Sequence, residues 1–388
     1  MAFGGREGKR PLVWTGEGTR IRRRNGRSSV RVAGVSVGLQ IRILTFTSDA
    51  AKLVFQIHAR FQRLQDNRKS VPWTMEQSSG NEKSTMPTVT IGLPVYNGEE
   101  FIRQTLESIV QQTFTDFELL IGDNASTDST LTICSAFASR DSRIRILASD
   151  TNKGAAPNYN RLVHEAAGKY FRWLPHDDLV APTFLEQCVG FLETHPSVIL
   201  CYPSTRPIDE NGKPFDREPE DALDVTAAQP SVRLGQYFES SFLNRQCNAV
   251  LGVVRTDVLR KTGLIGSYTG SDKILLAELA LQGPFHQLPD ALFYRRYHSG
   301  GSLALHPNPA ERDGWFDSLK RKRRVFVQWS WFAAYFTSIH RARLSTKDAL
   351  SSYLQMWRYF LLHRVALKDE LKKIIRAYGI GSSGRNMP

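Results

Sequence analysis

The sequence contains few cysteines and no long hydrophobic run, and both absences narrow the class of protein. Its four cysteines form no Cys-x-x-Cys pair and no Cys/His cluster at zinc spacing. This argues against a disulfide-stapled scaffold, and we expect reduced, mostly buried thiols. The most aromatic stretch, residues 326–336, is too short for the ~30 Å hydrocarbon core of a bilayer. We therefore predict no transmembrane helix.

Charge is distributed unevenly along the chain. The net charge is +13, but residues 1–86 carry 16 basic against 6 acidic side chains, and residues 301–388 carry the same numbers. Residues 87–300 are acidic, with 26 carboxylates against 19 basic side chains. An acidic middle fits a site that gathers carboxylates around a metal or a reacting hydroxyl. Basic flanks alone would suggest nucleic acid, but we expect no nucleic-acid partner.

Three regions follow one another in the sequence. Residues 1–86 are rich in Gly and Arg and carry no signal-peptide pattern, so we expect a basic, disordered extension. Residues 87–305 alternate apolar runs with amphipathic segments, which predicts an α/β fold of right-handed βαβ units and a mainly parallel sheet. Residues 306–388 are basic and predict a helical region, with main helices at 320–336 and 349–377.

The α/β region divides into a regular half, residues 87–205, and a looser half, residues 206–305. In the regular half we predict strands at 89–95, 117–121, 144–147, 170–174 and 198–202. The helices between them are predicted at 99–112, with Asn97 as N-cap, and at 129–138, 155–167 and 182–194. In the looser half we predict an irregular stretch at 213–240, strands at 249–254 and 291–297, and a helix at 273–281.

Polar side chains follow several of the predicted strands. Asp123 comes directly after the second strand, and His176-Asp177-Asp178 after the fourth. Because ligands of parallel sheets bind at the carboxyl ends of the strands, these are candidate site residues. Adjacent carboxylates are hard oxygen ligands for Mg2+ or Mn2+. Asp272 opens a predicted helix, and His298 follows the last predicted strand.

Each of these features also has a purely structural interpretation. Asn97-Gly98 can be only a turn, and the Gly122–Asp128 stretch can be ordinary helix capping by Ser126 or Thr127. Asp272 can cap the helix that follows it, and a histidine at a strand end often satisfies a backbone carbonyl. The order of the features along the chain favours a functional interpretation.

Read together, residues 89–302 resemble the family 2 glycosyltransferases. The resemblance covers 214 of the 388 residues. The stretches that carry it are Ile91–Glu99, Leu120–Asp128, Asn152–Gly154, Ala166–Tyr170 and His176-Asp177-Asp178. It implies a GT-A fold, in which a nucleotide-sugar-binding, Rossmann-like half (87–205) joins an acceptor-binding half (206–305), followed by C-terminal helices.

The resemblance also implies a role for particular residues. The nucleotide-binding residues would be Pro94, Tyr96, Asn97, Glu99, Asp123, Asn152, Gly154 and Asp177. Asp272 matches the catalytic base. A divalent metal, Mg2+ or Mn2+, would be held by Asp177, Asp178 and His298. One departure concerns the metal motif, which is usually Asp-x-Asp in this family, because Pro175 stands where the first Asp belongs.

The implied function is an inverting transfer of a sugar from a nucleotide sugar, expected to be a UDP-sugar, to a hydroxyl acceptor. The acceptor would be a glycan, a lipid-linked sugar or a small molecule, in glycan, polysaccharide or glycolipid biosynthesis. Because the Gln-x-x-Arg-Trp motif of processive synthases is absent, we expect non-processive transfer. The alternative is a nucleotide- or glycan-binding protein of the same fold with little or no activity, which Pro175 favours.

The expected location is cytoplasmic. The basic, aromatic C-terminal region is a candidate for peripheral contact with the inner face of the membrane, because Lys320–Arg324 precede the aromatic residues 326–336. The competing interpretation is that this aromatic segment packs on the catalytic domain.

Overall fold

The computed structural model describes residues 86–216, 223–243, 247–305, 309–316 and 327–378. The expected N-terminal extension lies outside the described residues except for Met86, and so does the Lys320–Arg324 cluster. None of the helices in the described ranges is both long enough and apolar enough to cross a membrane.

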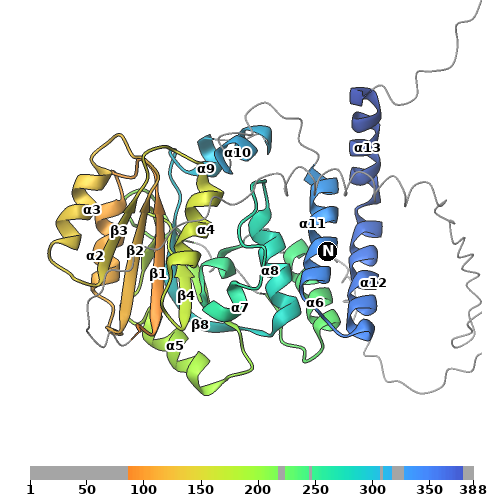
Figure 1. The fold of residues 1–388 in the computed structure, drawn as a ribbon, viewed down its shortest axis with the longest axis horizontal. Helices are drawn as coiled ribbons and strands as arrows, with labels where there is room; N and C mark the ends of the chain where they lie inside the picture. Colours follow the sequence, from red (N-terminus) through yellow and green to blue (C-terminus); the bar gives the residue numbers. More distant parts are fainter. Residues whose placement is uncertain (1–85, 217–222, 244–246, 306–308, 317–326, 379–388) are drawn as a thin grey trace, which may run out of the picture. The chain divides into compact units, whose positions relative to one another are not determined.

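One eight-stranded mixed sheet organises the described chain, in the order β3-β2-β1-β4-β7-β6-β8-β5 (Figure 1). Its first half is parallel and consists of β1 (Val89–Val95), β2 (Phe117–Asp123), β3 (Ile144–Ala148) and β4 (Tyr170–Trp173). The second half contains β5 (Leu179–Val180), β6 (Leu200–Ile208), β7 (Val253–Arg255) and β8 (Phe285–Arg296). Here β6 and β8 pair in parallel, while β7 and β5 pair antiparallel with their neighbours. The predicted α/β class with a mainly parallel sheet is confirmed.

Helices cover both faces of the parallel strands (Figure 1). The first face packs on α2 (Ile102–Val110), α3 (Thr130–Ala138) and α5 (Phe184–Thr194), and the second on α4 (Ala155–Glu165). In β1, alternate residues Val89, Ile91, Leu93 and Val95 point to the first face, as the two-residue period of a strand requires. On the second face a Cβ at Gly92 would lie 2.7 Å from Phe171, so the glycine permits close packing.

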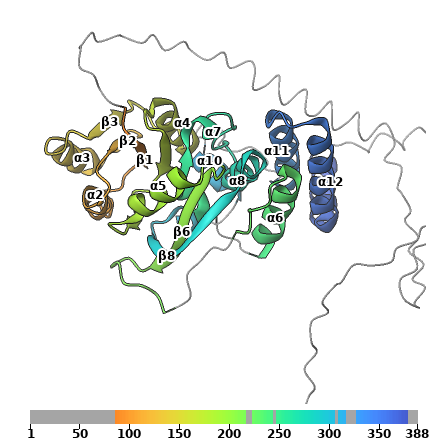
Figure 2. The ribbon, with the colours of Figure 1, turned by 90° about the horizontal axis from the view of Figure 1, so that it is seen from below.

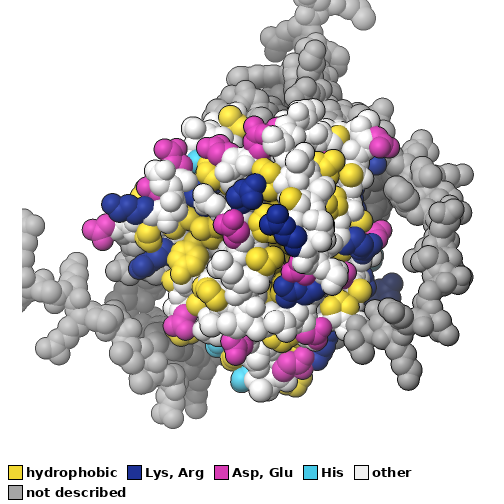
Figure 3. Space-filling model, turned by 90° about the vertical axis from the view of Figure 1, so that its left-hand side faces the viewer, with side chains coloured by type: hydrophobic (Ala, Val, Ile, Leu, Met, Phe, Trp, Pro, Cys, Tyr) yellow, Lys and Arg dark blue, Asp and Glu magenta, His cyan; other side chains and the backbone are white. Residues whose placement is uncertain are grey.

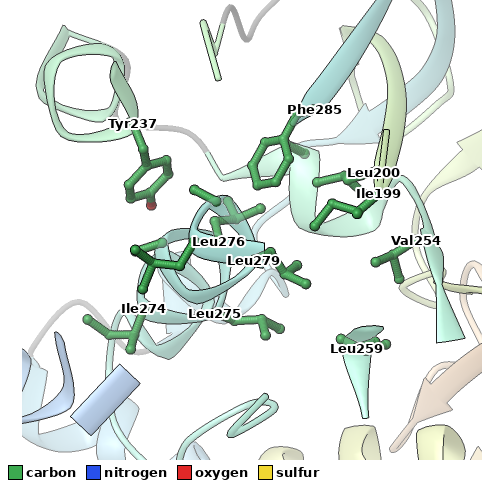
Figure 4. Close-up of a cluster of buried hydrophobic side chains, with 14 of the residues drawn as sticks. Ile199, Leu200, Tyr237, Val254, Leu259, Ile274, Leu275, Leu276, Leu279 and Phe285 are labelled. Carbon is green, nitrogen blue, oxygen red and sulfur yellow. The ribbon is translucent and has the colours of Figure 1, made fainter. Parts of the chain in front are cut away.

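The looser half is built around α8 (Ser271–Gln282), whose residues from Ile274 to Leu281 are all buried. Figure 4 shows its leucines facing Tyr237 of one helix and Ile199, Leu200 and Phe285 of the sheet. The helices α6 (Pro230–Leu243), α11 (Val327–Arg341) and α12 (Thr346–Leu362) lie side by side next to it (Figure 2). The aromatic helix α11 packs on α8, which buries Phe332 and Tyr335.

Two predictions in the looser half were wrong. The stretch 213–240 was expected to be irregular, but residues 230–243 form α6, because Leu234, Tyr237 and Phe238 share a helical face that packs on α8. The strand expected at 249–254 is a 3-10 helix (Asn248–Leu251) followed by the short β7. Between them a Cβ at Gly252 would lie 2.7 Å from the Cys201 carbonyl oxygen, so the chain can change direction there only with glycine.

The remaining described helices are α7 (Thr256–Leu259), α9 (Ser302–Leu305), α10 (Pro309–Phe316) and α13 (Arg364–Tyr378). The predicted helix at 349–377 is thus two helices, α12 and α13, which meet at His363. On the side of the molecule that includes α2 and α3, basic and acidic side chains are intermixed with hydrophobic ones (Figure 3). The described part of that face shows no patch of a single sign.

Candidate active site

The loops after β1 and β2 are held together by side-chain hydrogen bonds. The Asn97 backbone N–H donates to Ser126 Oγ (3.0 Å), and Asn97 Oδ1 accepts from the Thr127 N–H (2.8 Å). Glu99 Oε2 accepts from the Ser129 N–H (2.8 Å), at the start of α3. The prediction of Asn97 as an N-cap was wrong. The N-cap of α2 is Phe101, and Asn97 has φ 49° and bridges to the neighbouring loop instead.

This bridging leaves one aromatic ring exposed at the edge of the sheet. Tyr96 is 44% exposed, whereas Pro94 is buried and pairs in register with Gly122 of β2. The side chains of Asn97 and Glu99 therefore shape the loop, and Tyr96 offers a flat surface on which a nucleobase can stack.

Asp123 lies at the carboxyl end of β2, next in register to Val95 of β1. It is 2% exposed, and its two carboxylate oxygens face the Ser126 N–H at 3.3 and 3.4 Å. The next residue, Asn124, donates to Asn152 Oδ1 (2.9 Å), which also accepts from the Gly154 N–H (2.9 Å). Gly154 has φ 91°, a conformation that favours glycine. Asn124 thus brings Asp123, Asn152 and Gly154 to one edge of the sheet.

Asp177 and His298 form a pair although they are 121 residues apart. His298 Nε2 lies 3.1 Å from Asp177 Oδ2, and the imidazole packs edge-on against Phe101 with ring centroids 4.5 Å apart. Burial alone would raise the pKa of Asp177, but the hydrogen bond with His298 and the nearby histidine charges outweigh it and lower that pKa. The same hydrogen bond raises the pKa of His298. Without a metal, both effects favour a charged pair, and a cation bound there would take the place of the imidazole proton.

Asp178 is oriented differently from its neighbour. It is 4% exposed, and its Oδ1 accepts the Arg296 backbone N–H at 2.8 Å. Burial and the adjacent Asp177 charge raise the pKa of Asp178 well above its usual range. Arg296 fixes this segment further, because its guanidinium donates to the Asp177 carbonyl (2.8 Å) and to Gln104 Oε1 (2.8 Å).

Asp272 lies in the first turn of α8, and its Oδ1 accepts from the Lys273 N–H (2.9 Å). The helix N-cap is Gly270, with φ 81°, so the structural alternative that Asp272 is the N-cap was wrong. Tyr159 of α4 is one of the residues whose pKa is affected by the charge of Asp272. Burial raises the pKa of the Tyr159 hydroxyl, and the charges of Asp177, Asp178 and Asp272 raise it further.

The chemistry of the Asp177–His298 pair fits a divalent cation. A carboxylate oxygen and an imidazole nitrogen 3.1 Å apart can ligate Mn2+ or Mg2+ together, with diphosphate oxygens as further ligands. Asp178, in contrast, is already engaged by Arg296. Over the part of the chain that the structure describes, no group of three or more His, Cys, Asp or Glu side chains is arranged to hold a metal.

Sequence reasoning missed two residues of this region, Tyr159 and Arg295. Arg295 Nη1 lies 2.5 Å from Asn248 Oδ1. Its positive charge partly offsets the rise in the pKa of Tyr159 and of Asp178. Tyr159 reads as a residue of an amphipathic helix, and Arg295 as one of two adjacent arginines in a strand. Tyr159 and Arg295 differ from other residues of their helix and strand only in the direction in which their side chains point. The sequence pattern does not give that direction.

The sequence matches a known family over the segment that carries most of these residues. Residues 90–247 match the model for "Glycosyl transferase family 2". The putative glycosyltransferase EpsE of Bacillus subtilis is 38% identical over 110 residues, which cover 28% of this chain and 40% of the relative. The chondroitin synthase of Escherichia coli is 32% identical over 148 residues, which cover 37% of this chain and 21% of the relative. The matches thus span less than half the length of these relatives.

Solved structures of similar shape have low sequence identity. Staphylococcus aureus TarS 1-349 in complex with UDP-GlcNAc gives a TM-score of 0.46 at 17% identity, covering 77% of this chain and 93% of that one. The mannosyltransferase PcManGT of Pyrobaculum calidifontis, in complex with GDP-Man and Mn2+, gives a TM-score of 0.42 at 14% identity, with 86% and 92% covered. Likeness at this level supports no statement about donor or acceptor.

Proposed function

Because residues 90–247 belong to glycosyl transferase family 2, we propose that this protein transfers a sugar from a nucleotide sugar to a hydroxyl acceptor, with inversion. The observation that carries the proposal is the Asp177–His298 pair after β4, in which a carboxylate oxygen and an imidazole nitrogen lie 3.1 Å apart. Such transfer needs a site that holds a diphosphate beside a carboxylate that takes a proton.

The nucleoside would bind at the edge formed by β1 and β2. Tyr96 offers its exposed ring to the base, and Asp123 offers carboxylate oxygens at the end of β2. A carboxylate can accept the N–H of uracil, and the family resemblance implies uracil, so we propose a UDP-sugar as the donor. Asn152 and Gly154 line the same edge, while Pro94, Asn97 and Glu99 hold the loop that carries Tyr96.

The reaction would involve Asp177, His298 and Asp272. Asp177 and His298 would hold a divalent cation, which when bound neutralises charge on the departing diphosphate. Asp272 would accept the proton of the acceptor hydroxyl as that oxygen attacks the anomeric carbon. One positioned base contributes about 10² to 10⁴ in rate. A single displacement with one base inverts the anomeric centre.

A thermal-shift panel tests donor and metal together. The full chain is heated with UDP, GDP and their sugars, each with and without Mn2+. We expect UDP compounds to raise the melting temperature, and Mn2+ to increase that rise. A response to GDP compounds alone would contradict the choice of uracil, and no response to any nucleotide would contradict the proposed site.

A second candidate is a protein of this fold that binds a nucleotide sugar without turnover. The observation that favours it lies at the proposed metal position. The structure brings two ligand side chains together there, Asp177 and His298, and Pro175 stands where the first Asp of the Asp-x-Asp motif belongs. Release of UDP from UDP-sugars by the purified protein, with and without candidate acceptors, separates the two candidates. Donor-dependent stabilisation with no UDP release would favour the binding protein.

A further inference from the structure

Helix α12 presents an apolar face to solvent. Leu350, Leu354, Trp357 and Leu361 are 62%, 59%, 44% and 58% exposed. Their spacing of four, three and four residues places them on one side of the helix. We call these four side chains the α12 face. An exposed row of large apolar side chains is the usual mark of an interaction surface.

The opposite side of the same helix is buried in the protein. Ser352, Met356 and Phe360 are at most 2% exposed, where α12 packs on α6 and α11. Phe332 of α11 lies edge-on to Phe360, with ring centroids 4.7 Å apart. The helix is thus fixed by packing on one side, and the α12 face is held outward.

Exposed basic side chains lie on α12 and on the helix that follows it. Lys347 and Arg358 are exposed on α12 itself, and Arg364 and Lys368 are exposed at the start of α13. Residues 343–378 contain eight Lys and Arg against three Asp and Glu. One of the three acids is already engaged, because Glu370 accepts from the Gln328 N–H at 3.0 Å.

We propose that the α12 face docks on an anionic lipid surface. Leucine and tryptophan side chains would enter the interface between headgroups and acyl chains, while these exposed basic side chains meet lipid phosphates. Tryptophan favours this zone because its ring is large and its N–H is polar. The proposal is independent of the glycosyl transfer proposed above.

Charge argues against a second copy of the chain as the occupant. A two-fold symmetric dimer brings the same patch of both copies together. Arg358, Arg364 and Lys368 of one copy would then face the same cations of the other, and like charges in close contact are unfavourable. An anionic surface meets the same cations with favourable charge.

Vesicle flotation of the full chain tests the proposal. The protein is mixed with vesicles of phosphatidylcholine alone, or with about 30% phosphatidylglycerol added. We expect flotation with the anionic vesicles and weak flotation with the neutral ones. Failure of the wild-type protein to float with anionic vesicles would overturn the proposal.

A triple variant shows whether the α12 face is responsible. Leu354→Gln, Trp357→Gln and Leu361→Gln together remove most of its apolar surface, and partition to anionic vesicles should fall by about tenfold or more. The matched control carries Leu131→Gln and Val232→Gln, which are 38% and 40% exposed elsewhere, and should float like wild type. Equal flotation of the triple variant and wild type would mean that other basic segments bind the lipid, which overturns the proposal.

Two further measurements exclude other occupants. Size-exclusion chromatography with light scattering should give the same mass for wild type and triple variant. A wild-type oligomer that the triple variant dissociates would assign the face to a second copy and contradict lipid docking. Nucleotide-induced thermal shifts should be equal in both proteins, because none of the three residues lies in the candidate active site.

Discussion

At the residue scale, arginine side chains donate to the carbonyls at the ends of several helices. Arg233 donates to the Ala280 and Leu281 carbonyls at the end of α8, and Arg255 to the Leu192 and His195 carbonyls at the end of α5. Arg260 does the same for α4, with its shortest bond to the Ala166 carbonyl at 2.5 Å. The last carbonyls of a helix have no hydrogen-bond donor within it and carry partial negative charge. A guanidinium at this position donates to these carbonyls and balances their charge.

The role of Asp272 is tested by Asp272→Asn. The amide keeps the size of the side chain but cannot take a proton, so turnover should fall by about 10² to 10⁴ while donor affinity changes only a few-fold. Initial rates of UDP release and donor titrations measure the two quantities. Asp290→Asn, an exposed aspartate of β8, serves as the control and should behave like wild type. Near-normal turnover of Asp272→Asn would reject it as the base.

The two adjacent aspartates should differ in their response to metal. Asp177→Asn removes a carboxylate paired with His298, so Mn2+ should no longer tighten UDP binding. Asp178→Asn retains an oxygen that can accept the Arg296 N–H, so the Mn2+ effect should persist. Calorimetric titration of UDP with and without Mn2+ measures both variants. The reverse pattern would assign the metal to Asp178.

Thiol reactivity provides a pH test. Burial, helped by the charge of Asp123, raises the pKa of Cys134 to about 12, and burial raises the pKa of Cys188 as well. In the Cys247→Ser variant, native-state labelling should therefore stay slow from pH 7 to 10, although an ordinary thiol with a pKa of about 8.5 ionises in that range. Labelling by a maleimide, followed by mass spectrometry, measures the rates. A rise that follows an ordinary thiol titration would contradict the burial of these cysteines.

At the element scale, the sequence predicted the parallel half well and the other half poorly. The predicted strands at 89–95 and 144–147 agree with β1 and β3 to within one residue, because each is an apolar run ended by turn residues. The 12-residue β8 was predicted only from residue 291. Its first part contains Pro289 and Asp290 and is extended because it pairs with β6, a partner more than 70 residues away.

The candidate site divides in the same way. Its strand-end carboxylates could be found because motifs mark them. The structure pairs Asp177 with His298, and their role as metal ligands stays a prediction. The sequence pattern could not show that Asp178 turns toward Arg296, or that the charges of three aspartates raise the pKa of the buried Tyr159 hydroxyl. Both depend on side-chain direction and on contacts between elements far apart in the chain.

The contact between α8 and α11 contains an ion pair between the buried Glu278 and Arg341, whose side chain is 39% exposed, and this pair tests this half of the fold. Glu278 is 2% exposed and accepts from Arg341 Nη1 (2.9 Å), Ser338 Oγ (3.2 Å) and the Gly263 N–H (3.2 Å). Arg341→Met leaves this carboxylate buried without its cation, which should lower the free energy of unfolding by about 3 kcal/mol. Urea denaturation measures the change.

Lys261→Met is the control for that measurement. It breaks an exposed pair with Asp257, in which both side chains are more than 60% exposed, and should change the free energy of unfolding by less than about 1 kcal/mol. Equal effects of Arg341→Met and Lys261→Met would show that Glu278 is solvated in solution.

At the scale of the whole molecule, the C-terminal helices support the proposed active site through one continuous core. Phe360 and Met356 of α12 belong to the same hydrophobic cluster as Tyr237 of α6 and Leu276 of α8. Helix α8 in turn carries Asp272 at its start. The position of the proposed base therefore depends on packing contributed by residues more than 80 positions later in the chain.

This continuity predicts a single unfolding transition for the core and a large effect of Phe360→Ala. Truncating this 2%-exposed ring leaves a cavity beside Phe332, so the free energy of unfolding should fall by about 3 to 5 kcal/mol. Calorimetry should show the main transition moving as a whole, because α6, α8, α11 and α12 share one cluster. Leu354→Gln, on the exposed side of the same helix, should leave it in place. If Phe360→Ala instead splits off a separate early transition, the C-terminal helices unfold independently and do not stabilise the segment that carries Asp272.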